Sequence, residues 1–210
     1  MTDVAIVVGA SSGLGAAISA LLRQRRLEVV GVSRRGPDIR GDAALPETAK
    51  AALAEAQRRG ALRLLVNCAG SGVFKPVGSY TGEDVATVFT SNLATTIAFC
   101  QAIYPLFKQS GGTIVNVMST AALVGKPGET IYCAAKWAVR GYTEALRAEA
   151  KGTPVRIVSV YPGGMKTPFW SGDPRDVSTF MEPNDVAAAI VDALFQPKSV
   201  QVTELTITRP

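Results

Sequence analysis

The chain has 210 residues, of which 47% are hydrophobic, and 22 Lys and Arg against 17 Asp and Glu give it a formal net charge of +5. This length and composition suit one large α/β domain or two small ones, and they exclude a disordered or fibrous protein. Because the chain contains no histidine, it cannot itself carry Ser-His-Asp hydrolysis, Cys-His catalysis or a histidine-ligated metal site.

Apolar, β-branched runs alternate with helical segments along the chain. Runs such as AIVV and TIVNV lack polar alternation, which indicates strands that are covered on both faces. We expect strands at 4–9, 27–33, 62–67, 111–119, 154–162 and 200–207, and a short one at 37–42. We expect helices from the turn after the first strand to about residue 26, at 46–59, at 83–108 with a break or bend near Pro105, at 130–151 and at 183–195.

This alternation predicts an α/β fold with a doubly wound, mostly parallel sheet of the Rossmann type and helices on both faces, in three α/β/α layers. No Pro-, Gly- or Ser-rich linker divides residues 1–210, and no internal repeat is present. We therefore expect a single domain.

The predicted location rests on three features. No apolar run reaches membrane-spanning length, and the start, MTDVAIVVGASSG, has no basic region ahead of its apolar stretch, unlike a signal peptide. Cys68, Cys100 and Cys133 lie far apart in no metal-ligand spacing, as expected of small core residues in a reducing compartment. We expect a soluble, cytoplasmic protein without a metal site.

The first predicted strand ends in a glycine-rich turn, VVGASSGLGAA. Gly9, Gly13 and Gly15 stand between a strand and a helix, where glycine permits a tight turn and lets backbone amides approach a phosphate. This placement favours a dinucleotide site. The hydrolase pattern G-x-S-x-G is also present around Ser11, but it needs a histidine. No Gly-Lys-Ser/Thr follows for a nucleoside triphosphate, and a turn that binds nothing is the remaining alternative.

The second predicted strand ends in Ser33, Arg34 and Arg35. Many dinucleotide-binding folds place a carboxylate there to hold the adenosine ribose 2′-hydroxyl. A carboxylate would repel a 2′-phosphate, whereas a guanidinium binds it through charge-assisted hydrogen bonds. The sequence therefore favours NADP over NAD, with Arg34 the better candidate; the alternative is a solvated basic turn.

Five polar residues follow in an ordered series: Asn67, Asn92, Ser119, Tyr132 and Lys136. Tyr132 and Lys136 are four positions apart, about one helical turn, so their side chains share a face. Each residue has an ordinary structural explanation, such as a serine that caps a turn or a tyrosine whose ring is buried and whose hydroxyl is solvated. Their joint order near strand ends, where open α/β sheets bind ligands, indicates a functional site instead.

With these motifs the chain resembles the short-chain dehydrogenases/reductases, in their single-domain NAD(P)-dependent branch. The resemblance covers nearly the whole chain. The family's cofactor turn, T-G-x-x-x-G-x-G, matches at Gly9, Gly13 and Gly15 with Val8 in place of threonine. Its N-N-A-G stretch appears at 67–70, with Cys68 in place of the second asparagine.

The family's active-site residues match one by one. Its asparagine, serine, tyrosine and lysine fall on Asn92, Ser119, Tyr132 and Lys136, and its P-G-x-x-x-T element falls on 162–167. The resemblance implies hydride transfer between NADP(H) and a carbonyl or alcohol group of a small substrate. It also implies that Lys136 holds the nicotinamide ribose and that Asn92 supports a water-mediated proton relay.

On general chemical grounds, Tyr132 would donate or accept the proton and Ser119 would bind the substrate oxygen. Because a free tyrosine has a pKa of about 10, we expect a cationic Lys136 to lower the pKa of Tyr132 toward the working range.

The resemblance also implies the cofactor contacts, which lie on the glycine turn and at later strand ends. They are Gly9, Ser11, Ser12, Gly13, Leu14, Gly15, Ser33, Arg34, Arg35, Asp42, Asn67, Ala69, Gly70, Tyr132, Lys136, Pro162, Gly163 and Thr167.

Substrate contacts and assembly are less closely defined. Residues 168–182 are expected to form a short lid, in which Phe169, Trp170, Phe180 and Met181 cover the substrate or pack against the domain. The family usually assembles through its long helices, here near 83–108 and 131–151, so a homodimer or homotetramer is expected.

A non-catalytic NADP-binding regulator on the same fold is the main alternative. A nucleic-acid binder has only the net charge in its favour, because no polybasic tract is present.

Overall fold

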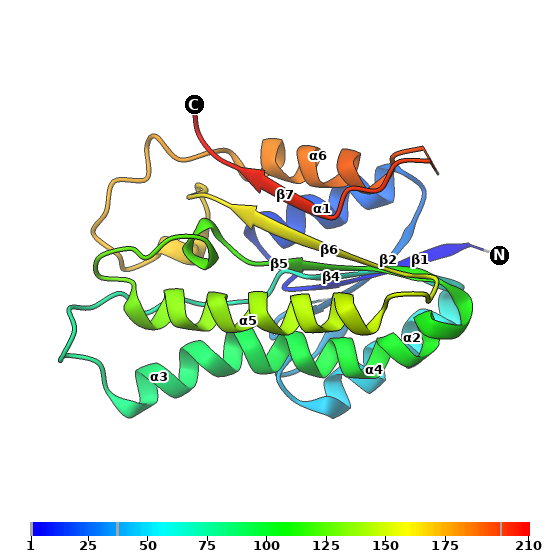
Figure 1. Cartoon of the computed structure of the whole chain (residues 1–210), viewed down its shortest axis with the longest axis horizontal. Coiled ribbons are helices and arrows are strands. Elements are labelled where there is room, and N and C mark those ends of the chain that lie inside the picture. Colours follow the sequence, from blue (N-terminus) through cyan, green and yellow to red (C-terminus); the bar gives the residue numbers. More distant parts are fainter. Residues whose placement is uncertain (1, 37, 198) are drawn as a thin grey trace.

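A parallel sheet forms the centre of the molecule, in a computed structural model that describes residues 2–36, 38–197 and 199–210. Within these residues the sheet has seven strands in the order β3-β2-β1-β4-β5-β6-β7, and every neighbouring pair is parallel (Figure 1). The strands are β1 (Asp3–Val8), β2 (Glu28–Ser33), β3 (Ile39–Arg40), β4 (Ala61–Asn67), β5 (Gly112–Val117), β6 (Val155–Pro162) and β7 (Glu204–Ile207). The strand order reverses between β1 and β4, as in a Rossmann-type fold.

Helices cover both faces of the sheet, in three layers (Figure 1). Two helices, α1 and α6, pack on one face, while α2, α4 and α5 pack on the other. Their bounds are α1 (Gly13–Gln24), α2 (Pro46–Arg59), α3 (Gly82–Phe89), α4 (Thr95–Ser110), α5 (Thr130–Glu149) and α6 (Pro183–Leu194). The predicted doubly wound α/β fold is confirmed.

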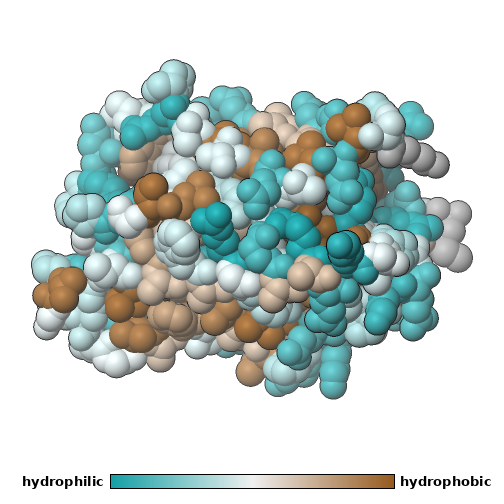
Figure 2. Space-filling model, in the orientation of Figure 1, coloured by the Kyte–Doolittle hydropathy of each residue, from teal (hydrophilic) through white to brown (hydrophobic). Residues whose placement is uncertain are grey.

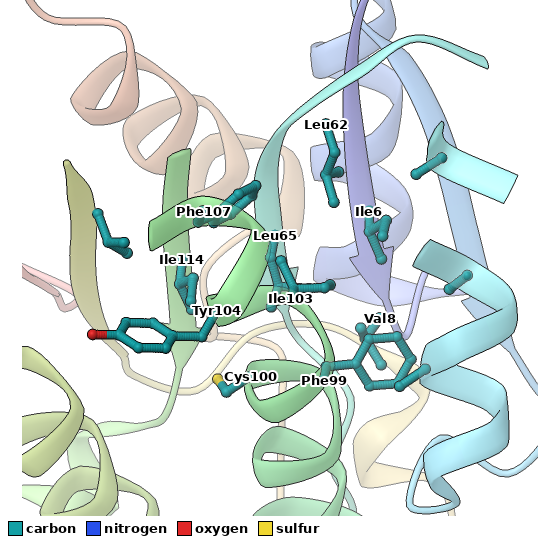
Figure 3. Packing of buried hydrophobic residues seen from close by; sticks show 14 of the residues in the cluster. Ile6, Val8, Leu62, Leu65, Phe99, Cys100, Ile103, Tyr104, Phe107 and Ile114 are labelled. Carbon is teal, nitrogen blue, oxygen red and sulfur yellow. The ribbon is translucent and has the colours of Figure 1, made fainter. Parts of the chain in front are cut away.

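The apolar runs form strands because both of their faces are buried. In β1, Ile6 and Val8 point to the face covered by α2 and α4, and Val7 points to the face covered by α1. Figure 3 shows the first of these two cores, where Phe99 and Ile103 of α4 pack against the sheet. Burial on both faces explains the absence of polar alternation.

The long helical stretch deviates from the prediction. The helix is not broken near Pro105, because α4 continues through that residue. The irregularity lies earlier, where Thr90–Ala94 form a π-helical turn between α3 and α4. Such turns insert an extra residue and are frequent at functional sites.

The same stretch also corrects the expectation about membrane length. Gly82–Ser110 is a helical run of 29 residues with a window of mean hydropathy 1.2, so by length and composition alone it could cross a bilayer. In this fold α4 packs against the sheet through Phe99, Ile103 and Phe107, and it has the apolar character of a core helix.

Two strands are shorter than expected. The run at 111–119 leaves the sheet after Val117, and Thr120–Ala122 form a 3₁₀ turn. The final strand begins only at Glu204, although its predicted start was residue 200. A further 3₁₀ turn, Pro168–Trp170, lies in the segment expected to form the lid.

Candidate active site

The carboxyl ends of the parallel strands meet at one edge of the sheet, where α5 begins and where the loops after β4 and β6 lie (left in Figure 1). Because the strand order reverses between β1 and β4, a crevice for ligands is expected there. The residues of interest reach this edge from β1, β2, β4, β5, β6 and the helices that follow them.

The turn after β1 is held close to its neighbours. Gly9 has a φ of +87°, and a Cβ atom there would lie 2.9 Å from the backbone of Ala69. A Cβ atom at Gly15 would lie 2.2 Å from the carbonyl oxygen of Gly9. A larger residue at Gly15 would therefore push α1 away from the turn, and a larger residue at Gly9 would collide with the loop after β4.

The start of α1 is chemically suited to an anion. Its N-cap, Ser12, makes no side-chain capping hydrogen bond, and the first turn contains no acidic residue. The first amides of the helix, including those of Leu14 and Gly15, have no intrahelical acceptor. Ser11 and Ser12 are exposed beside them. This arrangement fits the pyrophosphate of a dinucleotide.

Residues after β6 lie against the same turn. A Cβ atom at Gly13 would lie 3.1 Å from the Thr167 side chain. Pro162 ends β6, and the Gly163 amide donates to the Ile207 carbonyl at 2.8 Å. The structure thus brings the P-G-x-x-x-T element next to the glycine turn.

The end of β2 presents two exposed guanidinium groups. Within the described part of the chain, the side chains of Arg34 and Arg35 make no ion pair and no hydrogen bond, while the buried Ser33 hydroxyl accepts from the Arg35 amide at 3.3 Å. Asp42 lies near this end, because the amide of Gly41 donates to the Ser33 carbonyl at 3.3 Å. The exposed Asp42 carboxylate accepts from the Ala44 amide.

A carboxylate that the sequence analysis missed also lies beside β2. Asp38 accepts from the Gly31 amide at 2.9 Å and from the Arg59 guanidinium at 2.7 Å, through different oxygens. Both oxygens are thus engaged inside the protein. The exposed charged groups near the end of β2 then include the guanidinium groups of Arg34 and Arg35 and the carboxylate of Asp42.

Ser119 and Tyr132 lie at the start of the segments that follow β5. The Ser119 hydroxyl caps the 3₁₀ turn by accepting from the Ala121 amide at 3.1 Å. Tyr132 is in the first turn of α5 and is only 7% exposed. Burial raises the pKa of Tyr132 above its ordinary value; the Ser119 side chain opposes this shift and the Glu129 carboxylate adds to it.

Lys136 lies one turn after Tyr132. Its ammonium is 5.6 Å from the centroid of the Tyr132 ring and donates to the Val117 carbonyl at 3.4 Å. Burial lowers the pKa of Lys136 to about 8, with an opposing effect from Cys68. The expected lowering of the Tyr132 pKa by Lys136 is therefore not found in this structure, because burial disfavours the charged forms of both groups.

Asn92 lies in the π-helical turn and points toward the same region. Its amide nitrogen donates to the carbonyls of Val88 and Ser71, both at 2.8 Å. Its buried Oδ1 has no hydrogen-bond partner among the described residues. A Cβ atom at Gly70 would lie 2.4 Å from this oxygen and 3.4 Å from the Lys136 ammonium. The unpaired acceptor and the cation thus flank the same glycine.

Asn67 donates from its amide nitrogen to the interior of the protein. Its Nδ2 donates to Asn116 at 2.9 Å, and Asn116 donates to Thr143 at the same distance. The Nδ2 of Asn67 is therefore part of a buried network that joins β4, β5 and α5, while its buried Oδ1 has no hydrogen-bond partner among the described residues. Sequence analysis missed Asn116 and Thr143, although an asparagine inside the apolar run TIVNV was a usable signal.

Aromatic side chains cover Tyr132. The rings of Phe74 and Phe169 lie 5.6 and 5.5 Å from the Tyr132 ring, measured between centroids. Of the expected lid residues, Phe169 and Trp170 join this group and Phe180 contacts Trp170 at 5.4 Å. Met181 lies apart from these rings and pairs with Met165 in an isolated bridge. Phe74, which precedes α3 by only a few residues, was not predicted.

The chain matches known proteins over nearly its full length. The family model described as short chain dehydrogenase matches residues 3–177. A sepiapterin reductase from Chlorobaculum tepidum is 30% identical over 244 residues, covering 100% of this chain and 97% of the relative.

Solved structures agree. A short-chain dehydrogenase/reductase from Vibrio parahaemolyticus has a TM-score of 0.86 at 32% identity, covering 98% of this chain and 96% of that one. A short chain dehydrogenase from Burkholderia cenocepacia, solved in complex with NADP, has a TM-score of 0.84 at 29% identity, covering 97% and 87%. The chain therefore belongs to the short-chain dehydrogenase family of oxidoreductases.

Proposed function

We propose that this protein is an NADP(H)-dependent oxidoreductase that interconverts a carbonyl and an alcohol group of a small substrate. The observation that carries the proposal is the convergence of Ser119, Tyr132 and Lys136 with the unpaired oxygen of Asn92 at the edge of the sheet that holds the glycine turn. The glycine turn suited to a dinucleotide and the candidate acid–base group lie at the same edge of the sheet, which supports hydride transfer.

The preference for NADP rests on charge at the end of β2. Arg34 and Arg35 are exposed and unpaired among the described residues, and the neighbouring Asp38 is bound by Arg59 and a backbone amide. A guanidinium binds a 2′-phosphate through charge-assisted hydrogen bonds. The Burkholderia relative holds NADP, which supports the same choice. When bound, the nicotinamide supplies or accepts the hydride.

The protein's own contribution is the proton. In reduction, an oxyanion develops on the substrate, and Tyr132, which burial keeps protonated at neutral pH, donates its proton to that oxygen. The Ser119 hydroxyl hydrogen-bonds the same oxygen and stabilises its developing charge. Lys136, whose pKa is about 8, and the free Oδ1 of Asn92 lie along the path by which a proton returns to Tyr132.

We also propose a single catalytic domain with a short lid, an assembly through the long helices and a cytoplasmic location. Residues 1–210 act as one catalytic unit, and residues 168–182 form a short lid whose Phe169 contacts the Tyr132 ring. Hydrophobic side chains over α3 and the adjacent part of α4 (Figure 2), together with the exposed Trp137 of α5, support a homodimer or homotetramer through these helices. The well-separated free thiols support a cytoplasmic location.

The test is a panel of aldehydes and ketones assayed with NADPH and NADH in parallel. Turnover of at least one substrate with NADPH in preference to NADH is expected. NADPH binding without turnover of any substrate would favour the non-catalytic regulator, and failure to bind either cofactor would reject both readings.

A further inference from the structure

Three aromatic rings form a continuous layer over the Tyr132 side chain. We call Phe74, Phe169 and Trp170 the aromatic cluster. Trp170 stacks on Phe74 with centroids 5.2 Å apart and planes 23° apart, and Phe169 meets Trp170 edge-on at 4.8 Å. Phe74 and Phe169 each contact the Tyr132 ring at a steep angle, 75° and 55°. These are the offset and tilted geometries that aromatic pairs prefer.

The cluster joins two loops that are far apart in the sequence. Phe74 lies in the loop between β4 and α3, whereas Phe169 and Trp170 lie in the 3₁₀ turn after β6. All three rings are partly exposed. The cluster therefore lies at the protein surface and covers the buried acid–base group beneath it.

Arg175 fixes the outer side of the cluster. Its guanidinium lies 4.6 Å from the Phe74 ring centroid and 4.3 Å from that of Trp170. It also pairs with the carboxylates of Glu129 and Asp173, both at 2.7 Å. With two carboxylates on one guanidinium, this side of the site offers no spare positive charge to an anionic substrate.

From this arrangement we infer that the aromatic cluster is the substrate-binding wall and that it selects uncharged carbonyl compounds bearing an aromatic ring beside the carbonyl group. Because Phe74 and Phe169 contact the Tyr132 ring, we expect a substrate whose oxygen reaches Tyr132 to place its substituent against these rings or to displace Phe169 from Tyr132. In either case an aromatic substituent forms new ring contacts, whereas a saturated ring of the same size gains burial alone. The inference rests on the proposed function.

The test uses a matched pair of unreactive probes, benzamide and cyclohexanecarboxamide, which differ only in the aromaticity of the ring. The chain has two tryptophans, so a Trp137→Phe background leaves Trp170 as the single tryptophan. Quenching of the tryptophan fluorescence then reports binding with and without NADP. We expect benzamide to bind about 2- to 10-fold more tightly, the range for aromatic pair contacts. Equal affinities, or tighter binding of the saturated amide, would overturn the inference.

Two variants test which residues produce the preference for the aromatic probe. Phe169→Leu keeps an apolar side chain and removes one of the two rings that contact Tyr132, so the preference should fall below that of wild type, with the remaining part due to Phe74. Phe195→Leu, at an exposed ring at the end of α6, is the matched control and should keep it. Thermal melts establish that both variants fold. A preference that is undiminished in Phe169→Leu would refute the assignment to this cluster.

The same proteins separate this inference from the proposed function. They are assayed with NADPH on benzaldehyde, cyclohexanecarbaldehyde and 4-formylbenzoate, reading KM apart from kcat. If benzamide binds more tightly than the saturated amide but no aldehyde is turned over, the aromatic binding site is supported and the proposed oxidoreductase function is rejected. Turnover of aldehydes without a ring preference, or with the charged aldehyde favoured, rejects the aromatic site and leaves the function standing.

Discussion

The ammonium of Lys136 lies 5.6 Å from the centroid of the Tyr132 ring, and both side chains are buried at the start of α5. Burial has opposite effects on the two groups: it lowers the pKa of Lys136 to about 8 and raises the pKa of Tyr132. At neutral pH the pair therefore consists of a protonated phenol beside a cation that can lose its proton within a physiological range.

The shifted pKa of Lys136 predicts a pH-dependent stability. Between pH 8 and 10 the unfolded chain keeps this lysine protonated while the folded protein does not, so the unfolded state binds more protons and stability gained from this group rises with pH. In Lys136→Met this contribution is absent. At pH 8, Lys136→Met should therefore have a larger unfolding free energy than wild type. This difference should shrink by about 2–3 kcal/mol from pH 8 to pH 10.

The difference between the two proteins is the quantity to measure, by urea denaturation at several pH values. The thiols of Cys68 and Cys100 and the phenol of Tyr132, whose pKa values are raised, lower the stability of both proteins as the pH rises, and apart from the effect of Lys136 on Cys68 these contributions cancel in the difference. A difference that stays constant from pH 8 to pH 10 would show that Lys136 titrates normally.

Gly70 separates Asn92 from Lys136, so a side chain there should disrupt the site. In Gly70→Ala the new methyl would lie 2.4 Å from the Asn92 oxygen, and overpacking of this kind costs about 1–3 kcal/mol of stability. We expect loss of turnover together with a lower melting temperature. Gly141→Ala is the matched control: nothing lies within 4 Å of its added Cβ on α5, so it should keep activity and gain about 0.5–1 kcal/mol. Full activity in Gly70→Ala would contradict the packing described.

Arg34 is predicted to set the choice of cofactor. Removing hydrogen bonds to a charged group costs about 1.5–3 kcal/mol, so Arg34→Ala should raise the KM for NADPH about 10- to 150-fold. The KM for NADH should stay within about 2-fold, since NADH lacks the 2′-phosphate. Steady-state kinetics with both cofactors measure this, with Arg23→Ala on the exposed last turn of α1 as control. An equal rise in KM for both cofactors would mean that Arg34 does not bind the 2′-phosphate.

The buried amide network is predicted to be a structural requirement. Asn116→Ala removes the oxygen acceptor of the Asn67 Nδ2 and the donor to the Thr143 hydroxyl, which keeps only its bond to the Val139 carbonyl, and this should destabilise the protein by about 1–3 kcal/mol. Asn184→Ala, at an exposed position of α6, should change stability by less than about 0.5 kcal/mol. Chemical denaturation distinguishes these outcomes, and equal stabilities of the two variants would show that the network contributes little.

Local patterns explain what the sequence could predict. The run from β1 through the glycine turn to α1 is recognisable because strand, turn and helix follow one another within 24 residues, each with its own residue preferences. Ser119, Tyr132 and Lys136 were selected as candidate site residues by their order and spacing. The π-helical turn was missed because Asn92 sits within an uninterrupted helical pattern, and Pro105 offered a more obvious break.

Contacts between distant segments could not be predicted in this way. Phe74 meets Phe169 and Trp170 only after β4 and β6 have joined the sheet, and Arg175 reaches Glu129 across 46 positions of the chain. The pKa of Tyr132 was wrongly expected to fall, because the sequence places Lys136 one turn away but does not reveal that both groups are buried. Burial is a property of the assembled fold.

The most direct measurement is the oxidation of NADPH by wild type and Tyr132→Phe with a carbonyl substrate from the panel, alongside NADPH binding to both proteins. The phenyl ring keeps the contacts with Phe74 and Phe169 and removes only the proton donor. We predict a fall in kcat of about 10²- to 10⁴-fold, the usual contribution of general acid–base catalysis, with NADPH affinity changed by less than about 2-fold. Full turnover by Tyr132→Phe would contradict the proposed role of Tyr132.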